Sequence, residues 1–510
     1  SGGDNGNFEI GGTTLKVSSD HLSKLNYEQD NSYSVSITAR DGSGATTSLD
    51  TQINITNVNE ASVSRYNAKS DTFASSSLNP TNNPNFENLM SGYTWGNSIG
   101  NGIDLTYSLI SSSSKLSSGY KDTGSIQNPS SMFQSTVTEI LNLYSSVSLL
   151  SFSEVSETGD TTGHIRIGTS TGPPTEAYAW YPYPNFYASG DIWLKSETDN
   201  YNKSPKLVDG TYWNAAIVHE IGHSLGLAHP HEAETINGKT YGTNVSSGEV
   251  HSSLPYSVMS YAEYVGETIG SSSNNYSKPT TLMIDDIAAL QYLYGINEQY
   301  NAGDNLYTLG SFSKDSLDYV YASIWDAGGN DTFSWADQST IGAIDLNPGS
   351  FSCFGNISSV KDTDLASNTW SAGDGLLGIA YNANIENAIG GSASDTIAGN
   401  SSANTLYGGA GAGVKDTLTG NGGADIFVCS LSDASTDLSV ADIISDFTDG
   451  SDKIGLEDRT FANLTISNAT GSYSGDTQIV DSSSGKVLFL LDGIHAGLID
   501  DNDFVVTDFV

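Results

Sequence analysis

The amino-acid sequence predicts an α+β domain followed by an all-β domain of parallel strands, with a short β-rich extension at the N-terminus. Two observations support this. Between residues 86 and 300, three stretches carry apolar residues at helical spacing, with short strand-like runs between them. Beyond residue 300 this spacing fades, and Gly, Asp, Asn and Ser become frequent between short β-type runs. We therefore predict a β segment at 1–60, a linker at 61–85, an α+β domain at 86–300 and an all-β domain at 301–510.

The chain is strongly acidic. Its 510 residues include 19 Lys and Arg and 59 Asp and Glu, which gives a formal net charge of −40. Charged residues make up only 15% of the chain, below the usual ~25%, so the acidity reflects missing cations. Such a surface repels phosphate, which argues against nucleic acids and anionic membranes as partners. No stretch reaches the ~18 apolar residues of a membrane helix, so we expect no membrane span. The unpaired carboxylates indicate bound divalent cations or a salty medium.

The N-terminal segment has the alternation of β-strands. Period-two patterns predict strands at 34–39 and 51–56, joined by a turn at 41–44. The run 25–60 resembles the second half of a cadherin-like repeat, and a fragment of another small β-sandwich is the alternative. Because the first half of the repeat is absent, we expect a processing boundary within a longer protein. The first ten residues lack the basic and apolar regions of a secretory signal, so either one was removed or export uses another signal.

The α+β domain follows a linker rich in Ser, Asn and Pro. Its elements are predicted from local patterns, in chain order: a strand at 103–110, a helix at 130–146, strands at 164–167 and 191–194, a helix at 213–225 and a helix at 283–294. Gly295 ends the last helix.

A histidine motif lies in the second predicted helix and just beyond it. Residues 219–229 have the sequence His-Glu-Ile-Gly-His-Ser-Leu-Gly-Leu-Ala-His. His219 and His223 are four residues apart, so their imidazoles lie on one helix face and can meet one metal ion. Gly226 permits a sharp, left-handed turn that brings His229 back as a third ligand. Three neutral nitrogens leave an open position for water, as in a catalytic zinc site, and Glu220 can take the proton of that water.

The alternative is that these are surface histidines on an unrelated helix. The eleven-residue form of the motif is too specific to favour that interpretation. The other five histidines have weaker claims. We expect His21, His164 and His495 to be structural or exposed, whereas His231 and His251 lie near the motif in the sequence and could be rim residues.

Glycine and aspartate repeat in the all-β domain. Strand-like triplets begin after Asp395, Asn404, Asp416 and Asp425, at spacings of nine, twelve and nine residues, and glycines precede each. This period is typical of a parallel β-roll that binds calcium, in which glycine carbonyls and the Asp carboxylate supply hard oxygens and the apolar residue fills the interior. Ser392, Asn400 and Asn404 depart from the pattern, so those turns can bind weakly or be empty. The residues that we assign to calcium here are Gly390, Gly391, Asp395, Gly408, Gly409, Gly411, Asp416, Gly420, Gly422 and Asp425.

With its third His and Gly, and with Ser257-Val258-Met259-Ser260-Tyr261 downstream, the histidine motif resembles a metzincin with its Met-turn, specifically of the serralysin branch. The resemblance extends to 89–96 and 284–291 and covers about residues 86–510. It implies a secreted zinc endopeptidase with a twisted sheet, long helices and a calcium β-roll.

The resemblance also assigns roles to residues. It implies that Met259 lies beneath the zinc without binding it, and that Tyr261 is a flexible zinc ligand that stabilises the oxyanion. It implies that 190–195 is the edge strand that binds substrate, although a plain structural strand fits the sequence equally well. The residues so implicated are Gly190, Asp191, Ile192, Trp193 and Leu194. Further calcium ligands that the resemblance implies are Asn301, Gly303, Asn305, Asp326, Gly328, Gly329, Asp331, Asn384 and Glu386.

The predicted reaction is attack of a zinc-bound water on a peptide carbonyl, with Glu220 as general base. We expect one catalytic Zn²⁺, several structural Ca²⁺ ions, protein or peptide substrates, and a monomer. The end of the chain, 503–510, resembles an uncleaved type I export signal, which implies the type I secretion machinery as a partner and export from a Gram-negative bacterium.

Several alternatives remain open at this stage. A non-enzymatic calcium-dependent adhesin fits the repeats but not the histidine motif. A processing protease embedded in a larger surface protein fits both. Residues 1–85 could act as a pro-segment, although they contain no cysteine to bind the metal. Cys353 and Cys429 could form one bridge or stay as buried thiols.

Overall fold

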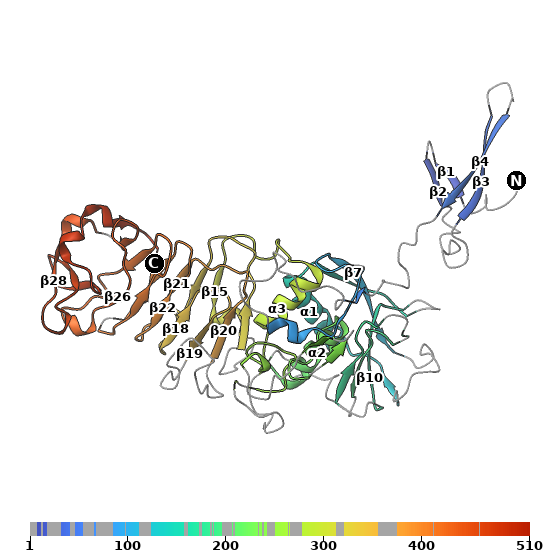
Figure 1. Cartoon of the computed structure of the whole chain (residues 1–510), viewed down its shortest axis with the longest axis horizontal. Coiled ribbons are helices and arrows are strands. Elements are labelled where there is room, and N and C mark those ends of the chain that lie inside the picture. The colour runs from blue at the N-terminus through green and yellow to red at the C-terminus, as the bar shows by residue number, and fades with distance from the viewer. Residues whose placement is uncertain are drawn as a thin grey trace. The chain divides into compact units, whose positions relative to one another are not determined.

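The structure is a computed structural model that forms two compact units, residues 1–63 and 64–510. Figure 1 draws the whole chain, with the elements labelled. The residues that the structure describes are 8–11, 14–17, 32–40, 46–54, 66–67, 85–96, 98–111, 124–157, 162–172, 176–183, 186, 188–195, 207, 210–232, 234–236, 239–241, 250–263, 265, 278–312, 321–354, 375–411, 413–457 and 459–509.

The N-terminal unit contains two antiparallel pairs among its described residues. β1 (Phe8–Gly11) pairs with β2 (Thr14–Val17), and β3 (Ser32–Arg40) pairs with β4 (Thr46–Asn54). The predicted strand at 34–39 is therefore confirmed, and that at 51–56 is confirmed over 51–54, although β4 begins earlier, at Thr46. Residues 55–56 and the predicted turn at 41–44 lie outside the described residues, and the cadherin-like resemblance stays a prediction. Within the predicted linker the structure describes only β5 (Tyr66–Asn67) and residue 85, and β5 pairs with β6 (Tyr93–Thr94).

Three helices pack against a twisted sheet in the α+β domain. The helices are α1 (Ser131–Val147), α2 (Tyr212–Ser224) and α3 (Ile284–Tyr294), each within two residues of its predicted bounds. The sheet strands are β7 (Ile103–Ile110), β8 (Ile126–Gln127), β9 (Leu150–Glu154), β10 (Ile165–Ser170), β11 (Ala177–Ala179) and β12 (Ile192–Lys195). A hairpin of β13 (Glu234–Ile236) and β14 (Lys239–Tyr241) follows α2.

The strand order of the sheet is β11-β12-β10-β7-β9, and β8 pairs with the end of β10. All pairs from β12 to β9 are parallel, whereas β11 runs antiparallel to β12. The antiparallel strand therefore forms one edge of the sheet. Figure 1 shows α2 beside this sheet, with α1 and α3 next to it.

Local sequence explains α1 well. Ser130 caps its first turn, because its hydroxyl oxygen accepts a hydrogen bond from the backbone N–H of Phe133. Its apolar face is buried, and the Tyr144 hydroxyl donates to the Val218 carbonyl at 2.6 Å. This hydrogen bond ties α1 to the middle of α2, the helix that carries the histidine motif.

The all-β domain is built from two sheets. One has the order β15-β17-β21-β23-β25-β27-β31, and the other β16-β20-β19-β18-β22-β24-β26-β30-β29-β28. Their bounds are β15 (Leu306–Thr308), β16 (Tyr321–Ile324), β17 (Thr332–Ser334), β18 (Gly342–Asp345), β19 (Phe351–Phe354), β20 (Gly375–Ile379), β21 (Asn387–Ile389), β22 (Thr396–Ala398), β23 (Thr405–Tyr407), β24 (Thr417–Thr419), β25 (Ile426–Cys429), β26 (Ile443–Ile444), β27 (Lys453–Leu456), β28 (Leu464–Asn468), β29 (Thr477–Asp481), β30 (Val487–Leu491) and β31 (Phe504–Val506).

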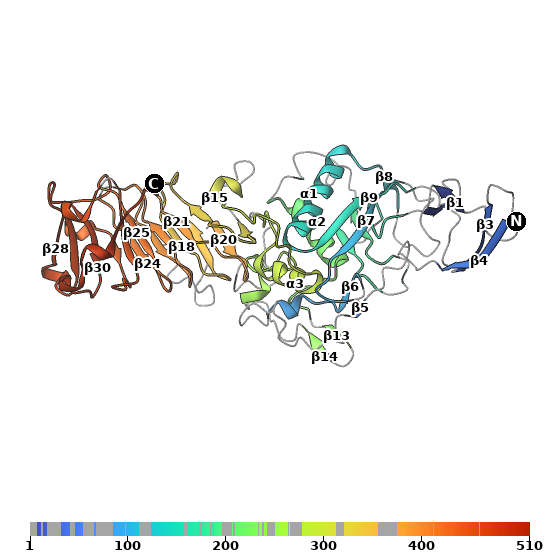
Figure 2. The same ribbon diagram turned by 90° about the horizontal axis from the view of Figure 1, so that it is seen from above.

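From β21 to β27 the chain alternates between the two sheets at every strand, which is the path of a parallel β-roll. The one apolar residue of each repeat points inward: Ile397, Leu406, Leu418 and Phe427 are all fully buried. The predicted architecture, an α+β domain followed by a parallel β-roll, is thus confirmed, and the roll continues directly from the helical domain (Figure 2).

Cys353 in β19 and Cys429 in β25 are both buried and do not bond to each other. None of the described helices has both the length and the apolar character needed to cross a bilayer.

Candidate metal centre

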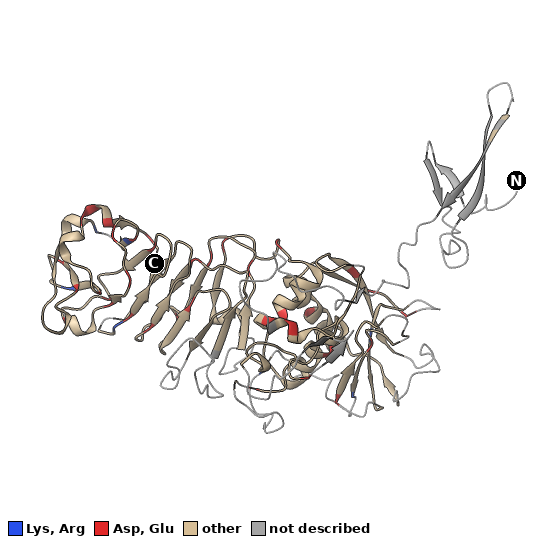
Figure 3. Ribbon diagram, in the orientation of Figure 1, with Lys and Arg blue, Asp and Glu red and all other residues tan. Residues whose placement is uncertain are grey.

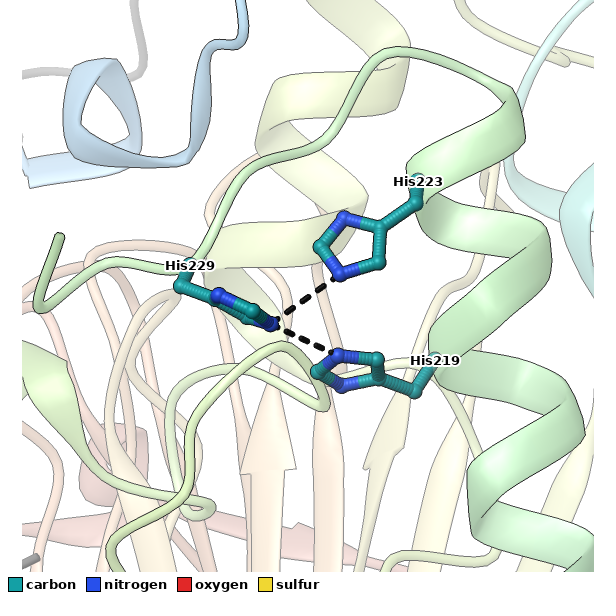
Figure 4. Close-up of side chains that lie close together, drawn as sticks. All are labelled: His219, His223 and His229. Carbon is teal, nitrogen blue, oxygen red and sulfur yellow. Dashed lines mark hydrogen bonds between the residues drawn. The ribbon is translucent and has the colours of Figure 1, made fainter. Parts of the chain in front are cut away.

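Three imidazole rings converge at the C-terminal end of α2. The Nε2 atom of His229 lies 3.0 Å from Nε2 of His219 and 3.0 Å from Nε2 of His223. The two helical rings are almost perpendicular, and the third comes from the chain that follows the helix (Figure 4). His219 and His223 are buried, and His229 is nearly so.

The hydrogen bonds of these rings leave their Nε2 lone pairs facing one another. Nδ1 of His219 lies 2.9 Å from the Val258 carbonyl oxygen, and Nδ1 of His223 lies 2.7 Å from that of Leu227. A carbonyl oxygen only accepts, so each Nδ1 must donate and each Nε2 is unprotonated in the neutral ring. Burial lowers the pKa of His219 to about 4 and that of His229 to about 2, which disfavours protonation. The two Nε2 lone pairs and the nearby Nε2 of His229 fit one divalent cation, and three nitrogens match the ligand set of catalytic zinc.

The third histidine returns because the chain reverses sharply after α2. Gly226 has a φ of +99°, and a Cβ there would lie 2.0 Å from the Tyr93 carbonyl oxygen. The segment then runs antiparallel to residues 89–91: Ser91 N–H donates to the Gly226 carbonyl at 3.0 Å, and Ala228 N–H donates to the Leu89 carbonyl at 2.7 Å. The left-handed turn predicted from the glycine is therefore confirmed.

Met259 lies beneath the helical turn between His219 and His223. It is fully buried, and a Cβ added at Gly222 would lie 2.5 Å from its Sδ atom. Met259 thus packs directly against the helix backbone, and its place beneath a bound zinc stays a prediction.

A carboxylate that the sequence analysis did not single out holds this turn in place. Asp286 is fully buried and accepts hydrogen bonds from the Ser257 hydroxyl (2.7 Å) and the Val258 N–H (2.8 Å). It also accepts from the Met283 N–H at 2.9 Å. Burial raises the pKa of Asp286 to about 7, and these hydrogen bonds oppose that rise. Since the Val258 carbonyl oxygen accepts from His219, Asp286 helps to orient this imidazole through a single intervening residue, Val258.

Glu220 is buried and directly follows His219 in α2. Its Oε2 atom has no hydrogen-bond partner among the described residues, and burial alone raises the pKa of the carboxyl group to about 8. A desolvated carboxylate with a vacant oxygen is suited to taking a proton from water.

Tyr261, His231 and Glu232 form the solvent side of the centre. The Tyr261 ring is 49% exposed and lies 4.5 Å from the His229 ring centroid. His231 stacks on His229 at 5.2 Å. An oxygen of Glu232 lies 3.0 Å from His229 Nδ1, in an ion-pair contact rather than an aligned hydrogen bond.

The remaining histidines lie elsewhere. His251 contacts a carboxylate oxygen of Asp285 at 2.7 Å, on the side of α3. Nδ1 of His164 accepts from the Thr106 N–H at 2.9 Å, and His495 lies in the roll. His21 lies outside the described residues.

The predicted substrate strand is not at the edge of the sheet. β12 lies between β10 and β11 and pairs with both, and its residues Ile192, Trp193 and Leu194 are at most 1% exposed. Gly190 and Asp191 are buried as well, and they pair with Trp180 beyond β11. The assignment of 190–195 as the edge strand is therefore wrong: β11 occupies that edge.

Comparison with known proteins agrees with this architecture. Residues 104–257 match the family model described as Matrixin, and residues 286–487 match that described as Peptidase M10 serralysin C terminal. Metallopeptidase AprA of Pseudomonas marginalis is 34% identical over 418 residues, which cover 76% of this chain and 80% of that protein. The chain belongs to the serralysin family. Serralysin C of Dickeya chrysanthemi is 36% identical over 319 residues (59% of this chain, 60% of that protein), and Serralysin of Proteus mirabilis is 33% identical over 286 residues (52% and 53%).

In this serralysin the predicted calcium residues of the repeats come together in stacked turns. The turn 390–395 lies on the turn 408–416: a Cβ at Gly409 would lie 2.0 Å from the Gly391 carbonyl oxygen, and one at Gly390 would lie 1.9 Å from that of Gly408. The Asp395 N–H donates to the Asp416 carboxylate at 2.7 Å. Burial raises the pKa of Asp395 to about 6 and that of Asp416 to about 8. Crowded carbonyl oxygens with two buried carboxylates fit the hard-oxygen shell of calcium.

The neighbouring stack, turns 399–404 and 420–425, has the side-chain amide of Asn404 where the first stack has the carboxylate of Asp395. Asn404 N–H donates to the Asp425 carboxylate at 2.8 Å, and the Asn404 side-chain amide donates to the Glu386 carbonyl at 2.9 Å. The amide of Asn400 donates to the carbonyls of Ile385 and Leu346, at 2.8 and 3.1 Å. Because the Asn404 side chain is uncharged, this stack offers a cation one carboxylate fewer than the first stack, which gives a physical reason for the weak turn that the sequence predicts.

Oxygens also gather at the start of the roll. The side-chain oxygen of Asn305 faces the carbonyl oxygens of Gly303 and, at 3.0 Å, Asn301, a contact that a cation or a rotated amide would relieve. The Asn305 N–H donates to Asp331 at 2.7 Å, and the other Asp331 oxygen has no partner among the described residues.

The rest of the predicted set surrounds this point. Gly328 N–H donates to Asp326 at 2.7 Å, and a Cβ at Gly329 would lie 2.6 Å from the Gly303 carbonyl oxygen. Glu386 accepts from the Asp331 N–H at 2.8 Å and from the Asn384 amide. These groups fit calcium in the same way.

Proposed function

We propose that this metalloendopeptidase cleaves peptide bonds of protein substrates at the three-histidine centre, with Zn²⁺ held by His219, His223 and His229. The observation that carries the proposal is that Nε2 of His229 lies 3.0 Å from Nε2 of both His219 and His223, while the other nitrogen of each ring faces an oxygen. Bound Zn²⁺ supplies a Lewis acid that polarises the scissile carbonyl and lowers the pKa of water.

The residues of the chain supply the proton transfers. Glu220 takes a proton from the attacking water with its unpartnered oxygen and passes it to the leaving nitrogen. The Tyr261 hydroxyl donates a hydrogen bond to the carbonyl oxygen as negative charge develops there. Burial raises the pKa of Tyr261, so this group remains protonated and able to donate.

We propose that the substrate pairs with β11. The backbone groups of Glu176 and Trp180 form hydrogen bonds with the segment that contains β12. In an antiparallel strand, successive residues direct their N–H and C=O groups to opposite sides, so those of Ala179 point to the open edge. An extended peptide added at this edge would lie beside the histidine centre, since the ring of Tyr181, two residues on, lies 5.4 Å from that of His223.

The variant Glu220→Ala tests the mechanism. We expect it to bind zinc at the wild-type level and to lose roughly 10²–10⁴-fold in kcat on casein, because only proton transfer is removed. Glu139→Ala, which removes an exposed carboxylate of α1, is the control and should keep wild-type turnover. Near-normal turnover by a zinc-replete Glu220→Ala protein would refute the mechanism. A zinc chelator should abolish the activity of wild-type protein.

We further propose that calcium bound at the stacked turns stabilises the roll, and that the C-terminus is the type I export signal. Residues 504–506 form β31, which pairs with β27 at the end of a sheet. Deleting 503–510 should leave active protein inside the cells, assayed in lysate and medium. Unchanged secretion would contradict the export proposal.

A further inference from the structure

A row of aromatic rings runs from β11 to the histidine centre. Each ring meets the next nearly edge to face, at centroid separations of 4.9–6.3 Å. The last ring lies 5.4 Å from His223. We call this the aromatic row; its members, in order of contact, are Tyr178, Trp180, Phe186, Tyr183 and Tyr181.

The row is held rigidly. Trp180 donates its backbone N–H to Asp191 at 3.0 Å and accepts from the Gly190 N–H at 3.1 Å. Tyr183 also meets Tyr93 at 4.7 Å, beside the turn that returns His229. These contacts restrain Trp180 and Tyr183 in the free protein, which lowers the entropic cost of binding.

The row also presents apolar surface to solvent. The Trp180 side chain remains 38% exposed, and the other four rings are partly exposed. All five members are aromatic, and none carries a formal charge. A large aromatic side chain left exposed beside a reactive centre is typical of a recognition surface, because its burial on binding is favourable.

The position of the row relative to β11 defines what it can contact. Tyr178 and Trp180 are two residues apart and project to the same face of the sheet, whereas Ala177 and Ala179 project to the other. A peptide paired at Ala179 directs alternate side chains to these two faces. Its side chains on the Tyr178 face would therefore lie against the row.

We propose that the aromatic row is a specificity subsite, which binds a large apolar and preferably aromatic side chain of the substrate on the His223 side of the scissile bond. This inference rests on the proposed function. Ring edges and faces complement another aromatic ring, whereas a charged side chain would lose hydration without an opposite charge within the row.

The test is a set of peptides with one scissile bond, in which Phe, Ala or Asp stands in turn at each flanking position. Wild-type enzyme should favour Phe over Ala at one position by roughly tenfold in kcat/KM, the size of one good aromatic contact, and should disfavour Asp there. Trp180→Ala should reduce the Phe-to-Ala ratio at that position to about two or less. Trp180→Phe should keep most of the ratio.

Leu498→Ala, which removes a 53% exposed apolar residue of the roll, is the control and should leave the ratio unchanged. Zinc content and the thermal midpoint show whether each variant is folded. If Trp180→Ala does not fold, Trp180→Leu keeps the bulk without the ring and should show the same loss of the ratio. An unchanged ratio in a folded variant overturns this inference and leaves the proposed function standing. No cleavage of any peptide by zinc-replete wild-type enzyme would instead refute the proposed function.

Discussion

Single residues decide whether the third histidine reaches the metal. Gly226 combines a φ of +99° with a carbonyl oxygen only 2.0 Å from where a Cβ would be. The left-handed conformation alone disfavours other residues by roughly 1–2 kcal/mol, and the steric conflict is with backbone, which cannot rotate away. The position therefore requires glycine for two independent reasons.

We expect Gly226→Ala to lower the free energy of unfolding by about 2 kcal/mol or more, because both costs apply. His229 should move with the distorted turn, so zinc content should fall below one ion per chain. Urea unfolding and metal analysis measure these effects. Gly475→Ala is the matched control, since a Cβ there meets nothing within 4 Å. A Gly226→Ala protein with the stability and zinc content of the wild type would contradict this account.

At the scale of elements, local patterns predicted much of the fold and the histidine centre. The helical spacing of His219 and His223 and the turn at Gly226 are properties of eleven consecutive residues, so the sequence shows them directly. The same holds for the three helices and for the inward apolar residue of each roll repeat, such as Leu418. In each case the interaction that decides the structure lies within one element or one repeat.

Relations between distant elements could not be predicted in this way. β11 has only three residues, Ala-Tyr-Ala, and its place at the edge depends on which strand pairs with β12. The resemblance points to 190–195 as the substrate strand, and its run at 192–194 suits strand addition, yet the apolar character of that run reflects burial between two neighbouring strands. Asp286 likewise acts on Val258, 28 residues earlier, through a packing contact that no local pattern encodes.

Across the whole molecule, Lys and Arg are too few to neutralise the carboxylates, which therefore repel one another. Figure 3 shows Asp and Glu along both described domains and few Lys or Arg. The roll joins α3 through Asp285, which accepts from the Tyr381 hydroxyl of the roll at 2.6 Å and contacts His251 at 2.7 Å. Tyr256, next to the Met259 turn, packs on Phe351 at 5.0 Å. A roll loosened by loss of calcium should therefore also weaken its hold on α3.

This coupling predicts that Tyr381→Phe matters only while the roll is formed. With calcium present, the variant should lose about 1.5–3 kcal/mol of unfolding free energy, the usual contribution of a hydrogen bond to a charged group. In protein refolded without calcium but with zinc, the difference between variant and wild type should shrink towards zero, because the loosened roll no longer presents Tyr381 to Asp285. Low salt should deepen the effect of calcium removal, since the carboxylates are then less screened. The measurement is the urea midpoint of wild type and of Tyr381→Phe, each with and without calcium. Tyr300→Phe, at a tyrosine that is 42% exposed, is the control. An equal loss from Tyr381→Phe with and without calcium would show that the contact forms independently of the roll, and the coupling would have to be abandoned.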